Sequence, residues 1–119
     1  MAPRGISLFL GPDRQRKLER VKAIGQALHV ALLDWHTMAA VDLSAATLLA
    51  LARQHPIASP ARLIVVDEAQ RLDGACLKAL GEHGQRFPET SRLILLVEAT
   101  LPASHPLIAL KPSCAVEHF

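Results

Sequence analysis

The sequence predicts an α/β fold, a three-layer sandwich in which a five-stranded, mainly parallel sheet lies between two layers of helices. Short apolar runs alternate along the chain with longer segments of helical periodicity, and this alternation is typical of parallel sheets. The run over residues 93–97 is continuously apolar, which predicts a strand covered on both faces. With 119 residues, the chain is expected to form one domain over residues 1–119.

The first two predicted elements are a strand over residues 6–10 and a helix behind it. Gly11-Pro12 closes the strand with a turn, and Asp13 is a good N-cap residue for the helix. Apolar side chains then recur at helical spacing to about residue 28. The predicted buried face of this helix consists of Leu18, Val21, Ile24 and Leu28.

The rest of the chain continues the alternation. A second strand is predicted over residues 31–35, and Ser44 is expected to cap a helix that ends before Pro56. The other predicted elements are a strand over 63–66, a helix capped by Asp73 that buries Cys76, Leu77 and Leu80, a strand over 93–97, a short helix over 104–110 and a last strand over 115–119.

The composition is that of a compact globular protein, with 50% hydrophobic and 20% charged residues. No apolar run reaches the roughly 20 residues that a membrane-spanning helix needs. The N-terminal residues lack the design of a signal peptide. We therefore expect a cytoplasmic protein that makes no contact with a membrane.

Cysteine and histidine usage predicts no metal site, and no cofactor is expected. Cys76 and Cys114 lie far apart and form no C-x-x-C pair, so both are expected to be reduced and packed as small hydrophobes. None of the six histidines has a cysteine or a second histidine at the spacing of metal ligands.

A basic cluster lies in the first predicted helix. A formal net charge of +2 is too small to indicate nucleic-acid binding, and few aromatic residues are present to stack on bases. The cluster is interpreted as a solvated helix face, with contact to a phosphate backbone as the alternative. Its members are Arg14, Arg16, Lys17, Arg20 and Lys22.

The strongest functional signal is a buried strand that ends in Asp67-Glu68. In nucleotide-hydrolysing folds, such carboxylates hold magnesium and polarise the attacking water. The matching phosphate loop, G-x-x-x-x-G-K-[ST], should follow the first strand. Gly11 and Lys17 stand at the right spacing, but Arg16 replaces the second glycine and Leu18 replaces the hydroxyl residue.

These substitutions predict a degenerate nucleotide site. Leucine has no oxygen for magnesium, and arginine cannot turn the loop as glycine does. Three interpretations of Asp67-Glu68 are open: a relic of an active site, which we favour, an inert turn, or a live magnesium site. For Gly11 and Lys17, the interpretation that we favour is a strand-ending turn and a surface lysine.

Two segments carry a resemblance to a known family. Residues 62–80 read RLIVVDEAQRLDGACLKAL and residues 91–102 read SRLILLVEATLP. Together with the order and spacing of the whole chain, they resemble the clamp-loader branch of the AAA+ proteins, and in particular the N-terminal domain of bacterial DNA polymerase III delta subunits. The resemblance implies a non-catalytic domain whose partners are the sliding clamp and other clamp-loader subunits, with DNA contacted at most indirectly.

In delta subunits, an apolar wedge that binds the clamp follows the helix before the third strand. The matching residues are His55, Pro56, Ile57 and Ala58. The family has a large aromatic residue there, and Ile57 is smaller. The alternative is that Pro56 and Ile57 end the helix and fill the core.

The remaining comparison with the family concerns motifs that the sequence lacks. No arginine precedes Cys114, where the clamp-loader subunits that trigger hydrolysis carry one, and this favours the delta type. The sequence is expected to contain neither the lid nor the collar domain of delta subunits. Two other hypotheses stay open: a divergent ATPase that uses Lys17, Asp67 and Glu68, and a scaffold that needs no nucleotide.

Overall fold

In the part of the chain that the structure describes, the sheet has five strands, and all its strand pairs are parallel. The computed structural model describes residues 5–83, 88, 90–98, 101, 105, 107–108 and 115–119. Neighbouring strands follow the order β2-β3-β4-β1-β5. The predicted α/β fold with a mainly parallel sheet is confirmed. The strands are β1 (Ile6–Leu10), β2 (Trp35–Ala39), β3 (Arg62–Asp67), β4 (Ser91–Val97) and β5 (Ala115–His118).

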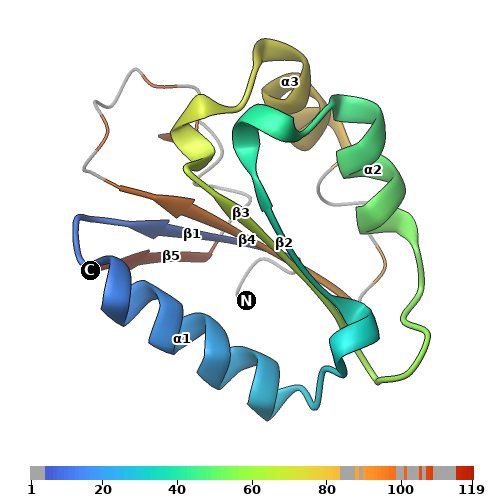
Figure 1. The fold of residues 1–119 in the computed structure, drawn as a ribbon. Helices are drawn as coiled ribbons and strands as arrows, with labels where there is room; N and C mark the ends of the chain where they lie inside the picture. The colour runs from blue at the N-terminus through green and yellow to red at the C-terminus, as the bar shows by residue number, and fades with distance from the viewer. Residues whose placement is uncertain are drawn as a thin grey trace.

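Helices cover both faces of this sheet. The helix α1 (Arg14–Ala27) lies on one face, and α2 (Ala45–Arg53) and α3 (Gly74–His83) lie on the other (Figure 1). Each helix begins after the residue predicted to cap it. The Asp13, Ser44 and Asp73 side chains accept hydrogen bonds from the N–H groups of Arg16, Thr47 and Cys76.

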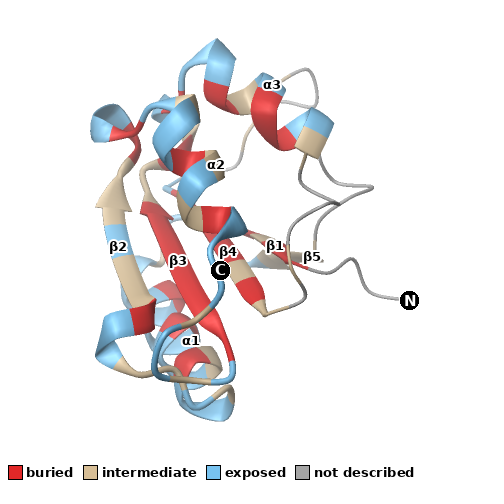
Figure 2. Ribbon diagram, turned by 90° about the vertical axis from the view of Figure 1, so that its right-hand side faces the viewer, coloured by how far each residue is buried: buried red, intermediate tan, exposed pale blue. Residues whose placement is uncertain are grey.

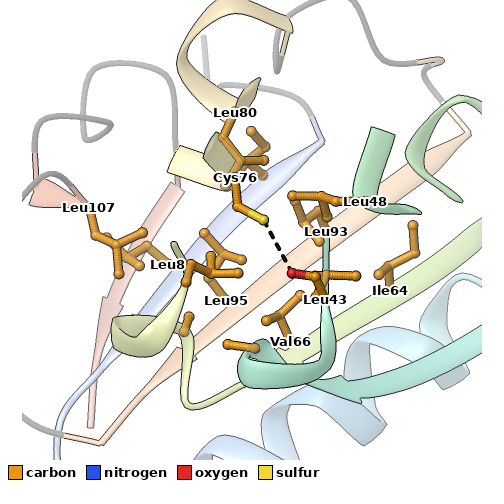
Figure 3. Packing of buried hydrophobic residues seen from close by; sticks show 14 of the residues in the cluster. Leu8, Leu43, Leu48, Ile64, Val66, Cys76, Leu80, Leu93, Leu95 and Leu107 are labelled. Carbon is orange, nitrogen blue, oxygen red and sulfur yellow. Dashed lines mark hydrogen bonds between the residues drawn. The ribbon is translucent and has the colours of Figure 1, made fainter. Parts of the chain in front are cut away.

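Alternate residues of the central strands contribute to two hydrophobic cores. On the α1 face, Leu63 and Val65 of β3 pack with Phe9 and Val21. On the opposite face, β3 and β4 pack against α2 and α3 (Figure 3). Figure 2 shows β3 almost entirely buried and β2 only half-buried at the sheet edge. The buried apolar side chains drawn in Figure 3 include Leu8, Leu48, Ile64, Val66, Cys76, Leu80, Leu93 and Leu95.

The second strand is displaced from its predicted position. β2 begins at Trp35, so the prediction of a strand over residues 31–35 is wrong. Leu32–Asp34 form a turn of 3-10 helix (η1) instead, and Leu32 and Leu33 are exposed. The apolar pair Leu32-Leu33 has the sequence pattern of a buried strand. β2 itself is a half-buried edge strand, and its apolar pattern is weak.

The buried face of α1 is the predicted one only in part: Val21 is buried and Ile24 packs half-buried against the core. The buried residues of α1 are Lys17, Val21 and Gly25, which recur every four positions, while Leu18 is 41% exposed. The assignment of Leu18 to the buried face is therefore wrong. A Cβ atom at Gly25 would lie 2.3 Å from the Trp35 ring, so glycine is what allows the helix to approach β2 so closely.

Some predictions fall where the structure gives little or no description. The short helix predicted over 104–110 lies largely outside the described residues, and Cys114 lies wholly outside them. Within the described part, Cys76 is a buried free thiol, and burial raises its pKa to about 11. None of the described helices is long and apolar enough to cross a membrane. No group of three or more potential metal-ligating side chains occurs among the residues described.

Candidate functional site

The fold brings the predicted nucleotide-site residues together at the carboxyl-terminal edge of the sheet. Gly11 follows β1, Asp67 ends β3, and Lys17 lies in the second turn of α1. The Lys17 Nζ atom lies 2.7 Å from the Gly11 carbonyl oxygen and 2.6 Å from that of Val97, the last residue of β4. Open α/β sheets bind ligands at this edge.

Gly11 allows a close approach of other atoms to its backbone, and the atoms that lie there belong to the backbone of Phe119. Gly11 has a φ of +128°, a conformation that favours glycine, and a Cβ atom there would lie 1.9 Å from the Phe119 carbonyl oxygen. The Phe119 N–H donates to the Leu10 carbonyl at 2.7 Å. The Phe119 ring packs on Phe9 with ring centroids 5.0 Å apart. Phe119, which follows β5, therefore occupies the space beside Gly11.

Lys17 is a structural residue of this edge. Its side chain is only 2% exposed, so the interpretation as a surface lysine is wrong. Both of its described hydrogen bonds are donated to backbone carbonyls, those of Gly11 and Val97. Burial lowers the pKa of Lys17, although the nearby Glu98 charge acts in the opposite direction. In this arrangement the ammonium group links β1 to β4 and is not directed at solvent.

The carboxylate of Asp67 is neutralised by Arg14. The guanidinium group donates to both carboxylate oxygens, at 2.8 and 2.6 Å, in the bidentate geometry that gives strong charge-assisted pairs. The hydrogen bond from Arg14 is the main cause that lowers the pKa of Asp67, and it raises that of Arg14. The neighbouring Glu68 has a left-handed backbone with a φ of 51° and lies 3.5 Å from Arg71. Both acidic residues therefore have cationic partners within the chain.

The amino terminus of α1 also has partners of its own. An anion would bind there to backbone N–H groups that the first turn leaves free. The Arg14 N–H donates to the Pro12 carbonyl at 3.0 Å, and the Arg16 N–H donates to the Asp13 carboxylate at 3.1 Å. The carboxylate of Asp13 stands where an anion would be, and Arg16 and Leu18 extend from the outer side of the helix.

The basic cluster is only partly a free, solvated surface. Arg14 pairs with Asp67, Lys17 is buried, and the Arg20 Nε atom lies 3.0 Å from the Glu117 carboxylate. These partners reduce the positive charge available to a nucleic-acid backbone. The remaining members, Arg16 and Lys22, are exposed.

The second candidate site lies at the opposite edge, where the strands begin. His55, Pro56, Ile57 and Ala58, here called the tip, join α2 to β3 (Figure 1). The Ile57 side chain is 74% exposed and does not fill the core. His55 and Ala58 are also exposed, and Pro56 is half-buried.

Sequence reasoning missed the residue that holds the tip. The buried Asp34 carboxylate accepts hydrogen bonds from the N–H groups of Ile57 at 2.6 Å and Ala58 at 2.8 Å, and from the Ser59 hydroxyl. Burial alone would raise the pKa of Asp34, but these hydrogen bonds outweigh it and lower the pKa to about 2. An aspartate within an apolar run was the available signal, because a buried carboxylate needs several donors.

The fold of the chain, a parallel sheet with helices on both faces, is shared with two proteins of known structure. The structure is similar to the Bacillus subtilis DNA clamp loader delta protein, with a TM-score of 0.82 and 16% sequence identity over 98% of this chain. It is also similar to a DNA polymerase III gamma subunit-related protein from Thermotoga maritima, with a TM-score of 0.73 and 13% identity over 99% of this chain.

These likenesses define the fold of the chain. The chain spans 38% of the length of the Bacillus protein and 42% of the length of the Thermotoga protein. No protein-family model and no curated protein matches the sequence.

Proposed function

We propose that this chain is a non-catalytic clamp-loader domain of the delta type, which binds the DNA sliding clamp through the tip. The observation that carries the proposal is the exposed Ile57 side chain on a loop whose backbone is tied down by Asp34. Apolar anchors of this kind bind pockets on protein partners. The likeness to the Bacillus DNA clamp loader delta protein supports the clamp as the partner.

The groups that would handle a nucleotide support a role without catalysis. Arg14 donates hydrogen bonds to the Asp67 carboxylate, and the Lys17 ammonium group donates to backbone carbonyls. We propose that other clamp-loader subunits supply the ATP hydrolysis of the assembly, and that this domain contributes the contact with the clamp.

The first expected result concerns Ile57. Replacement of Ile57 by aspartate is expected to weaken binding to the cognate sliding clamp at least about tenfold, because a charge would replace the apolar anchor. Calorimetric titration of the full chain with the clamp measures this change. Val41→Asp is the matched control, since Val41 is also exposed but follows β2 at the other end of that strand. Failure of the wild-type chain to bind, or equal binding by both variants, contradicts the proposal.

The second expected result concerns nucleotide. Titration of the chain with magnesium and ATP to about 1 mM is expected to show no saturable binding, since Lys17, Asp67 and the Arg16 N–H group already have partners within the chain. Saturable binding that Asp67→Asn abolishes would favour the divergent ATPase instead. A folded chain that binds neither ATP nor the clamp is what the scaffold hypothesis predicts.

A further inference from the structure

We propose that the clamp-docking surface has two segments, Leu32-Leu33 in η1 and Ile57 in the tip, and that Asp34 fixes their relative position. The surface rests on the proposed function, since its partner is the same sliding clamp. What it adds is two contact residues, Leu32 and Leu33, and one positioning residue, Asp34, on a part of the chain that lies before the tip in sequence.

Hydrogen bonds join the two segments directly. Asp34 immediately follows the two leucines, and its carboxylate accepts from the Ile57 and Ala58 N–H groups and from the Ser59 hydroxyl. From the other side, the Ala31 N–H donates to the Ser59 hydroxyl oxygen at 3.0 Å. The segment before β2 and the segment before β3 are thus held side by side at the edge where these strands begin.

Exposed apolar side chains concentrate on these two segments. Among the described residues, the large hydrophobic side chains that are exposed are Leu18, Leu32, Leu33, Val41 and Ile57. Leu32 is 90% and Leu33 is 65% exposed, and they lie between Ala31 and Asp34, which both form hydrogen bonds with the loop that carries Ile57. Apolar groups gathered in one place mark an interaction site, whereas isolated ones are ordinary on a protein surface.

The groups that support the surface from beneath, Asp34 and Arg62, are buried and lie against each other. The Arg62 guanidinium, 2% exposed, lies 3.8 Å from the Asp34 carboxylate, and its Nη1 atom lies 2.8 Å from Nε2 of His36. Since Asp34 is held by this arginine and by the tip backbone together, the exposed side chains stand on a preorganised base. Preorganisation lowers the entropy that a partner must remove on binding.

The chemistry of the surface indicates an apolar partner. Residues 31–33 and 56–60 contain no charged side chain, and the one carboxylate nearby, Asp34, is buried. Nucleic acid is bound chiefly through cations that contact phosphates, and neither of these two runs contains a lysine or an arginine. An apolar pocket on the sliding clamp therefore fits it. A second copy of the chain is the competing protein partner that the experiment has to separate.

The contact residues are tested by clamp titration of the full chain. The double variant Leu32→Ser/Leu33→Ser is expected to bind the clamp at least about tenfold more weakly than wild type, while Val41→Ser stays within about twofold. If Ile57→Asp weakens binding but the double variant binds like wild type, the two-segment surface is overturned and the proposed function stands. If the wild-type chain does not bind, both fail.

Asp34 is tested through its coupling to Ile57. Asp34→Asn is expected to weaken clamp binding about fivefold in the wild-type background, but less than about twofold in the Ile57→Ala background. A residue that merely stabilised the fold would cause the same loss in both backgrounds, and that result would remove its positioning role. If Asp34→Asn does not fold, Ser59→Ala is measured instead in the same two backgrounds, because it removes the hydroxyl group that joins the two segments.

Sedimentation without the clamp separates the two partners. The wild-type chain is expected to sediment as a monomer at the concentrations used for titration. Concentration-dependent dimers that the Leu32→Ser/Leu33→Ser variant abolishes would assign the surface to a second copy of the chain and overturn the clamp as its occupant.

Discussion

Replacement of Gly11 by alanine is expected to lower the free energy of unfolding by about 3 kcal/mol or more. A side chain at a φ of +128° is strained by about 1–3 kcal/mol. The new Cβ atom would also lie 1.9 Å from the Phe119 carbonyl oxygen. Relief of such a clash displaces the segment after β5, and overpacking of this kind costs about 1–3 kcal/mol. Equilibrium urea denaturation measures the change.

Gly74→Ala is the matched control for this substitution. Gly74 begins α3, and a Cβ atom there would meet nothing within 4 Å. Alanine is the better helix former, so this variant is expected to be neutral or more stable by up to about 1 kcal/mol. A Gly11→Ala variant as stable as wild type would mean that the Phe119 backbone does not lie against Gly11.

Replacement of Lys17 by methionine is expected to lower the free energy of unfolding by about 2 kcal/mol. Methionine retains most of the apolar stem but leaves the Gly11 and Val97 carbonyls without their donor, at about 1–3 kcal/mol for each. Part of this loss is offset, because the buried ammonium group no longer has to be desolvated. Urea denaturation again supplies the measurement.

The control for Lys17 is a lysine of the same helix in a different environment. Lys22 is exposed, and Lys22→Met is expected to change stability by less than about 0.5 kcal/mol. In a working phosphate loop the lysine contacts the nucleotide, so its loss would impair binding and leave the fold intact. Equal stability of Lys17→Met and wild type would therefore remove the structural role assigned to Lys17.

The elements with strong apolar patterns were predictable, and the edge strand was not. β1, β3 and β4 lie between two covered faces, so their sequences are almost continuously apolar. β2 is half-buried, and its predicted position followed the exposed pair Leu32-Leu33. The same limit applies to α1, where the buried face depends on the fit between Gly25 and Trp35, a contact between distant residues.

The candidate sites show a similar division. The spacing of Gly11, Lys17 and Asp67 in the sequence was enough to predict that they lie at one edge of the sheet, because strand ends in a parallel sheet lie together. The partners of these residues were not predictable, since they depend on tertiary contacts. The Val97 carbonyl that accepts from Lys17 lies 80 positions further along the chain, and Arg14 and Asp67 are 53 positions apart. Asp34 escaped notice for the same reason, as its donors lie beyond α2.

The contact between Trp35 and Gly25 provides the chain with a built-in optical reporter. Trp35 is the sole tryptophan of the sequence, and no tyrosine is present, so its indole dominates the near-ultraviolet emission. It follows Asp34 directly, begins β2 and lies half-buried against Gly25 of α1. Its fluorescence therefore reports on the packing of α1 and on events beside Leu32 and Leu33, without any label on the surface itself.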